Sequence, residues 1–281
     1  MPDRRPPSAA VLLLHGGRET GLGPPPPGPL NLPAARMRPF ARALAGATGD
    51  GAADILVRPA RYTHRGWNGP REDPYHDAVR ALDALRREAG EIPVVLVGHS
   101  MGARAALRAA GHPLVRGVVG LAPWCPDDDP VTQLAGCDVV LLHSTRDRVT
   151  SPRESQSFTV RARRAGAHAC LIAIRGSDHA MLRRAGAWHE LTTCVVTGLL
   201  GLGPLPGAVT TALRLPLAAP ATDGTLDLDR LDLGRRDHAP SGHGRPGAGG
   251  SGRTRRRAVP GSRSFPGAAP WCRGGGTGAP W

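Results

Sequence analysis

Short apolar runs alternate with helical patterns through the first 205 residues, and this alternation constrains the fold more than any other feature. Most of the runs are unbroken stretches of Val, Leu and Ile, as expected of strands that helices cover on both faces. The pattern predicts an α/β fold with an open, mostly parallel six-stranded sheet and helices on both faces. The predicted strands lie near Ala10–Leu14, Asp54–Val57, Val94–Val97, Val115–Gly120, Val139–His143 and Ala169–Ile174.

The helices between these strands have recognisable ends. Asp73-Pro74 predicts one helix start, with Asp73 as the N-cap and proline at the first helical position. Ser151-Pro152-Arg153-Glu154 predicts another start, because a capping serine is followed three residues later by glutamate. A last helix is predicted from about His179 to Leu200. Long loops are expected at 16–33 and 58–73, and loops of this length are often functional.

The pentapeptide Gly98-His99-Ser100-Met101-Gly102 follows a predicted strand and precedes a helical pattern. A Gly-x-Ser-x-Gly in that position is typical of a nucleophile elbow, where a sharp, strained turn lifts the serine hydroxyl above the sheet. The flanking glycines remove Cβ atoms that would clash in such a turn. Asp147 and His179 follow later in the chain, each just after a predicted strand.

Four segments together resemble the α/β-hydrolase family: Leu13–Gly17, the elbow around Ser100, Arg146–Val149 and Gly176–His179. The resemblance extends from residue 10 to about residue 202. It implies that Ser100 is the nucleophile, His179 the general base and Asp147 the acid that orients His179. It assigns the oxyanion hole to backbone N–H groups of Met101 and of the loop after His15, where Gly17 is expected and Arg18 is the alternative.

Several assignments have alternatives. Asp127-Asp128-Asp129 follows the fourth strand, where some hydrolases of this fold carry their acid; we favour Asp147 because the triplet before Pro130 resembles a solvated turn. We expect His15 to fix the oxyanion loop rather than act as a base. Trp67 and Trp124 either line a substrate pocket or cap the core.

Fewer than twenty residues separate the fourth and fifth strands, which leaves no room for a cap domain. We therefore expect a minimal, open hydrolase that cleaves an ester or thioester of a small-molecule acyl substrate through an acyl-enzyme on Ser100. Dienelactone hydrolases place a cysteine at the elbow, so the serine argues against that chemistry. A catalytically silent binding protein, and an acyltransferase or peptidase on the same triad, are the alternatives. No cofactor or metal is expected.

We divide the chain into a catalytic domain (1–205), a linker (206–234) and a Gly/Arg/Pro/Ala-rich tail (235–281) that is expected to be disordered. The tail holds nine arginines and one acidic residue, and so eight of the thirteen net positive charges. The charge therefore belongs mainly to the tail, and nucleic-acid binding is not expected. Five cysteines without a Cys-x-x-Cys pair, and no apolar run long enough to span a membrane, favour a cytoplasmic location. The sequence does not indicate an oligomeric state.

Overall fold

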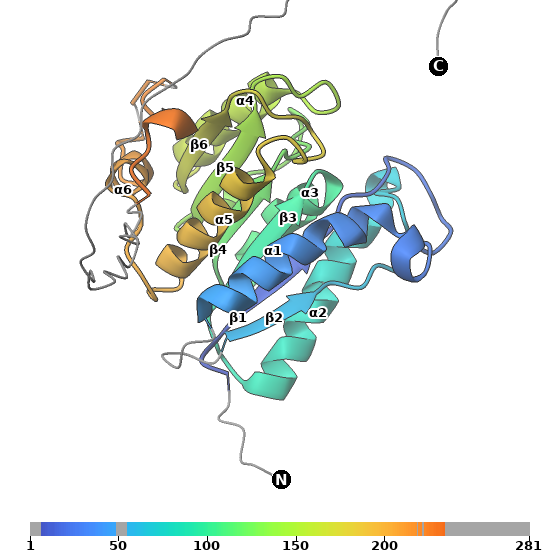
Figure 1. The fold of residues 1–281 in the computed structure, drawn as a ribbon. Coiled ribbons are helices and arrows are strands. Elements are labelled where there is room, and N and C mark those ends of the chain that lie inside the picture. Colours follow the sequence, from blue (N-terminus) through green and yellow to red (C-terminus); the bar gives the residue numbers. More distant parts are fainter. Residues whose placement is uncertain (1–6, 49–54, 218, 221, 234–281) are drawn as a thin grey trace, which may run out of the picture. The chain divides into compact units, whose positions relative to one another are not determined.

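One sheet of seven parallel strands organises this protein (Figure 1). The structure, a computed structural model, describes residues 7–48, 55–217, 219–220 and 222–233. The strand order is β2-β1-β3-β4-β5-β6-β7. The strands are β1 (Ala9–Leu14), β2 (Ile55–Pro59), β3 (Val94–His99), β4 (Val115–Leu121), β5 (Asp138–Ser144), β6 (His168–Ile174) and β7 (Thr225–Asp227). The predicted α/β class is confirmed, and all six predicted strands are present with ends within two residues of the prediction.

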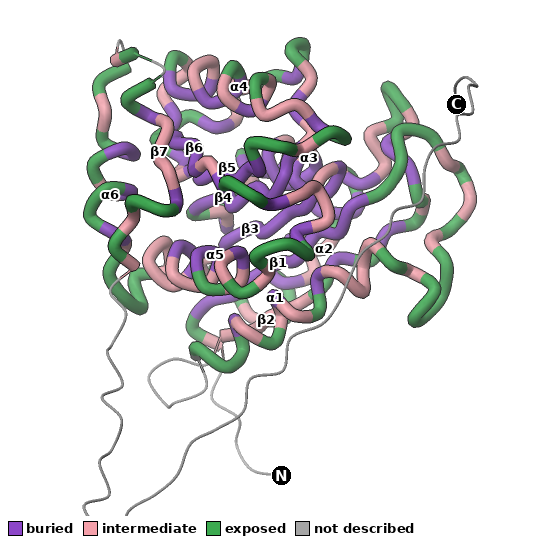
Figure 2. The backbone as a smooth tube through the Cα atoms, turned by 45° about the horizontal axis from the view of Figure 1, so that its top comes forward, coloured by how far each residue is buried: buried purple, intermediate pink, exposed green. Residues whose placement is uncertain are grey.

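Helices cover both faces of the sheet. They are α1 (Leu32–Thr48), α2 (Asp73–Ala89), α3 (Met101–Arg108), α4 (Pro152–Arg164), α5 (Ala185–Leu199) and α6 (Gly207–Leu213). Alternate strand residues point to opposite faces, so Leu12 belongs to the core on the face that α2, α3 and α4 cover, whereas Leu13 belongs to the core under α1, α5 and α6. Figure 2 shows the central strands buried and the exposed backbone gathered in loops and outer helix faces. Burial on both faces explains why the strands are continuously apolar.

The seventh strand corrects the predicted count of six. β7 lies in the segment for which we predicted a linker, and it pairs with β6 through the partners Leu171 and Thr225. Leu226 packs on the face that α1 and α5 cover, and the buried Arg163 guanidinium donates to the Pro216 carbonyl at 2.8 Å. A three-residue strand is too short for its periodicity to be seen, and these contacts come from residues distant in the sequence. The predicted disordered tail lies outside the described residues.

Two of the three predicted helix starts differ from the structure. Ser151 caps α4 as predicted, since its Oγ accepts the Glu154 N–H at 3.3 Å. Asp73 is the first residue of α2 rather than its cap, and Glu72 before it is left-handed, with φ 43°. The helix predicted as the last, α5, begins at Ala185 instead of near His179, because Met181 and Arg184 have positive φ angles of 58° and 59°, and α6 follows it in the predicted linker. His179 therefore lies on a loop. No helix among the described residues is long and apolar enough to cross a membrane.

Candidate active site

Ser100 occupies the turn between β3 and α3 with φ 54° and ψ −119°, a conformation that L-residues rarely adopt. Neighbouring backbone makes glycine necessary on both sides. A Cβ atom on Gly98 would lie 2.4 Å from the Gly102 carbonyl oxygen, and one on Gly102 would lie 2.3 Å from the Leu14 carbonyl oxygen. The turn is therefore strained and tightly packed, as predicted for an elbow that presents a side chain at the carboxyl edge of the sheet.

His179 and Asp147 meet at the same edge, on the loops after β6 and β5. The His179 Nδ1–H donates to Asp147 Oδ2 at 2.8 Å. The Asp147 side chain has no exposed surface, and its Oδ1 accepts the backbone N–H groups of Val149 at 2.8 Å and Thr150 at 3.1 Å. Because Nδ1 carries the proton that binds Asp147, the neutral His179 ring keeps an unprotonated Nε2, as a general base requires.

A second histidine, His143, also binds Asp147. It lies at the end of β5, is 1% exposed, and its Nε2 is 3.2 Å from Asp147 Oδ2. An ionised carboxylate only accepts hydrogen bonds, so Nε2 is the protonated nitrogen, and Nδ1 accepts from Ser155 Oγ at 2.7 Å. His143 lies in a predicted strand, and no role was predicted for it. A polar residue inside an apolar strand was the only signal, and its partner cannot be read from the sequence.

Asp147 stays ionised despite its burial. Burial opposes ionisation, but hydrogen bonds from His143 and His179, and from the backbone N–H groups of Val149 and Thr150, outweigh it and hold the pKa of Asp147 well below its usual range. The carboxylate is therefore an anion at any pH at which the site would work, and it faces two imidazoles.

His99 connects this pair to the elbow. Its Nε2–H donates to the His179 carbonyl oxygen at 2.9 Å, and the two rings lie 4.9 Å apart. Burial, together with the nearby His179 ring, lowers the pKa of His99 to about 3, so His99 is neutral. Because His99 directly precedes Ser100, this contact places the His179 ring beside the elbow. The Ser100 hydroxyl itself makes no hydrogen bond within the described part of the chain; such contacts are often long before substrate binds.

The loop after β1 lies against the start of α3. A Cβ atom on Gly17 would lie 2.2 Å from Met101 Cε, so Gly17 packs against the side chain of the residue after Ser100. The Arg18 N–H already donates to the Arg65 carbonyl at 3.1 Å, whereas the Gly17 N–H has no acceptor among the described residues. Met101 is the first residue of α3, so its N–H has no partner inside the helix. The geometry favours Gly17 over Arg18.

His15 stabilises that loop. Its Nδ1–H donates to the Gly16 carbonyl at 2.7 Å, and Tyr62 donates its hydroxyl to the His15 carbonyl at 3.1 Å. Burial lowers the pKa of His15, which keeps the ring neutral. These contacts support the expected structural role of His15 in holding the oxyanion loop.

Asp129, part of the alternative acidic triplet, does not lie in a solvated turn. It is 7% exposed, and its carboxylate accepts two hydrogen bonds from Arg104, at 2.8 and 2.7 Å. The Arg104 guanidinium in turn lies 4.0 Å from the ring centre of Trp67 and 4.3 Å from that of Trp124. The prediction of a solvated turn was wrong for Asp129, because its partner Arg104 lies 25 residues earlier in the chain.

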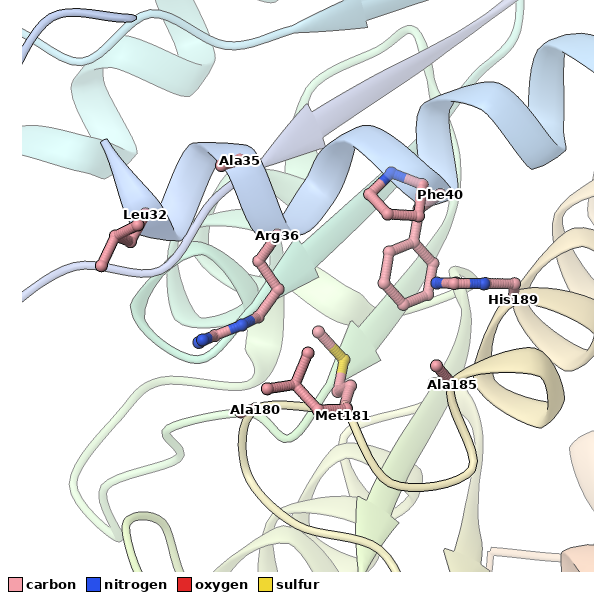
Figure 3. A pocket seen from close by; sticks show the side chains of 10 residues that line it. Leu32, Ala35, Arg36, Phe40, Ala180, Met181, Ala185 and His189 are labelled. Carbon is pink, nitrogen blue, oxygen red and sulfur yellow. The ribbon is translucent and has the colours of Figure 1, made fainter. Parts of the chain in front are cut away.

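Three cavities among the described residues border the loops that carry Asp147 and His179. The first, of about 460 Å³, is lined by His179 itself; the second, of about 550 Å³, by Asp147 and Trp124. The third, of about 300 Å³, lies between α1 and the loop after His179, where the side chains of Phe40, Met181 and His189 face one another (Figure 3). Trp67, at 2% exposure, packs in the core and lines none of the three. No group of three His, Cys, Asp or Glu side chains suited to a metal occurs in the described segments.

Solved structures share this architecture. A protein of unknown function from Agrobacterium tumefaciens, a candidate α/β hydrolase, is 12% identical with a TM-score of 0.54, and the match covers 73% of this chain and 92% of that one. The fold is that of the α/β hydrolases. Est1E from Butyrivibrio proteoclasticus is 12% identical with a TM-score of 0.51, covering 72% and 92% of the two chains.

An uncharacterized protein from Bacillus cereus ATCC 10987 is 15% identical with a TM-score of 0.52. The match covers 71% of this chain, which spans 61% of the length of the Bacillus protein. No protein-family model matches the chain, and no curated protein sequence matches it. At these identities the likeness establishes the fold alone, and an argument about chemistry depends on the site.

Proposed function

We propose that this protein is a serine hydrolase that cleaves an ester or thioester through an acyl-enzyme on Ser100. The observation that carries the proposal is the 2.8 Å contact between His179 Nδ1 and Asp147, formed beside a strained elbow that presents Ser100. The nucleophile Ser100, the acid Asp147 and the base His179 follow one another along the chain in the order Ser, Asp, His, which is the order of this fold. Fold likeness alone does not select a reaction.

The chemistry follows from the roles of these groups. His179 Nε2 takes the Ser100 proton as Oγ attacks the substrate carbonyl, and Asp147 stabilises the imidazolium that forms. The N–H groups of Gly17 and Met101 stabilise the oxyanion of the tetrahedral intermediate. His179 then returns the proton to the leaving alkoxide or thiolate as the carbonyl–heteroatom bond breaks. Water, deprotonated by His179, attacks the acyl-enzyme, and the carboxylic acid leaves as Ser100 recovers its proton.

The open site favours small substrates. Only residues 122–137 connect β4 to β5, and they hold one short 3₁₀ turn, Thr132–Leu134. No cap domain is inserted there, so water must be excluded by the loops around the site. A small-molecule ester or thioester fits this arrangement better than a long lipid chain. Acyl transfer and peptide cleavage would use the same triad, with another acceptor or another scissile bond.

A fluorophosphonate probe is expected to label the protein at Ser100, because a base-activated serine attacks phosphorus as it attacks a carbonyl carbon. Peptide mass spectrometry locates the label. Ser100→Ala should not be labelled, whereas Ser157→Ala, which removes an exposed hydroxyl from α4, should be labelled like the wild type. Equal labelling of wild type and Ser100→Ala would contradict the proposal. A silent binding protein would hydrolyse 4-nitrophenyl acetate no faster than Ser100→Ala does.

His143 is expected to act as a positioning residue for Asp147. His143→Phe removes the N–H donor at Asp147 Oδ2 and should lower kcat about tenfold with KM little changed, which corresponds to about 1.4 kcal/mol in the barrier. His143→Gln places an amide N–H near the same point and should recover most of the activity. Loss of a donor also makes Asp147 more basic, so the acid limb of the pH–kcat profile should move to higher pH in the Phe variant. A Phe variant with wild-type kcat and pH profile would exclude this role.

A further inference from the structure

The loop that carries Asp147 presents two arginines beside the site. Asp147 turns inward, and its side chain has no exposed surface. Arg146 and Arg148, on either side of it, are both exposed. The inward turn is fixed by the hydrogen bonds that Asp147 accepts from Val149, Thr150 and the two histidines. The same interactions that hold the acid therefore direct its two neighbours outward.

Both arginines line the cavity of about 460 Å³ that His179 also lines. This volume lies within the range of small-molecule sites, which is roughly 300–1,000 Å³. Arg183 lines the cavity from the loop after β6, and Arg148 also lines the adjoining cavity that contains Trp124. A substrate that reacts at the elbow can thus extend past His179 into a space bordered by three arginine side chains.

Little negative charge compensates this space. Among the described residues no carboxylate forms an ion pair with Arg146 or Arg148. Asp178, the one acid that lines the cavity, accepts the backbone N–H groups of Leu182 at 3.2 Å and Arg183 at 3.3 Å, and its contact with the Arg183 guanidinium is 3.9 Å. Every basic residue of the chain is arginine, so arginine frequency carries no weight here. The inference depends instead on the position of these side chains beside His179.

We propose that this cavity is an anion-binding subsite and that the substrate ester carries a carboxylate. The inference rests on the proposed hydrolase function and specifies its substrate class. Guanidinium groups bind carboxylates through paired N–H donors, and a cavity open to water on one side suits a charged group that stays partly hydrated. The carboxylate can belong to the acyl part or to the leaving group, so the test includes both.

Two matched pairs of esters test the proposal. Mono-4-nitrophenyl glutarate is compared with 4-nitrophenyl 5-methylhexanoate, in which an isopropyl group replaces the carboxylate, and 4-acetoxybenzoate is compared with 4-acetoxybenzamide. In at least one pair we expect kcat/KM to be higher for the anionic ester than for the neutral ester. The double variant Arg146→Gln/Arg148→Gln should reduce this ratio of kcat/KM values about tenfold, since each exposed ion pair contributes up to about fivefold. The preference should weaken between 0.05 and 0.5 M NaCl, because salt screens exposed charges.

Arg116→Gln/Arg164→Gln is the matched control. It removes the same charge from exposed positions near the start of β4 and at the end of α4, so the ratio should stay as in the wild type. A ratio that both double variants reduce equally, or that neither changes, would overturn the subsite. If both neutral esters are hydrolysed in a Ser100-dependent manner without preference for the anions, the proposed function stands and the subsite falls.

Binding gives a readout independent of turnover. Saturation-transfer NMR with glutarate should show contact with the wild type and with Ser100→Ala, and weaker contact with Arg146→Gln/Arg148→Gln. If no ester is hydrolysed, this difference still supports the anion subsite while the hydrolase proposal fails. Equal saturation transfer in wild type and double variant contradicts the subsite.

Discussion

Replacing Asp147 with Asn is expected to lower kcat for ester hydrolysis about 10⁴-fold while the chain stays folded, the size of effect seen when a triad acid becomes an amide. The local geometry gives the reason. The Val149 and Thr150 N–H groups bind Oδ1 and so hold the Asn carbonyl there, which turns its NH₂ group toward His143 and His179. A donor at that position forces His179 to accept at Nδ1 and to carry its proton on Nε2. The nitrogen that should take the Ser100 proton is then already protonated.

The same assay separates Asp147 from its alternative. Asp129→Asn loses charge from a buried carboxylate that binds Arg104, so it should lower thermal stability yet leave kcat of the folded enzyme near that of the wild type. Initial rates with 4-nitrophenyl acetate and a circular-dichroism melt for each variant complete the comparison. A large loss of kcat in Asp129→Asn together with a small loss in Asp147→Asn would move the acid to the loop after β4.

The strands could be predicted because their environment is uniform. Leu12 and Leu13 are both buried although they face opposite sides of the sheet, and such runs stand out in any sequence. The seventh strand could not be predicted, because three residues are too few to show an alternation of apolar and polar side chains and its pairing depends on β6. The residues that we propose as nucleophile, acid and base could be selected from the sequence because each follows a strand directly, and the carboxyl ends of parallel strands meet at one edge.

Turn geometry and contacts between distant residues explain what could not be predicted from the sequence. His143 and Asp147 are four residues apart, but only the turn after β5 brings His143 Nε2 to the carboxylate. Asp129 looked solvated because Arg104, its partner, precedes it by 25 residues. The helix expected from His179 is present from Ala185 onward, as its apolar pattern predicts. Positive φ angles at Met181 and Arg184 are not encoded by glycine, so no sequence rule indicates that the helix starts late.

His99 is expected to make the fold sensitive to acid. Burial lowers its pKa from 6.5 to about 3 in the folded state. Above pH 6.5 the ring is neutral in both states and contributes no pH dependence. Below pH 6.5 the unfolded chain binds a proton that the folded chain does not bind until about pH 3. The free energy of unfolding therefore decreases as the pH is lowered. The loss from this one group should reach about 3 kcal/mol at pH 4 and about 5 kcal/mol below pH 3.

The variant His99→Gln isolates this contribution, because its amide can still donate to the His179 carbonyl but does not titrate. Guanidinium denaturation at pH 7 and pH 4 gives the loss of unfolding free energy for each protein, and that loss should be about 3 kcal/mol smaller in the variant. Carboxylates, and the other buried histidines, contribute equally to both proteins and cancel. His76→Gln, on an exposed position of α2, should keep the wild-type loss. If His99→Gln and wild type lose the same free energy, the ring beside Ser100 is solvated or charged in the folded protein, and the contact that places His179 at the elbow would have to be reassigned.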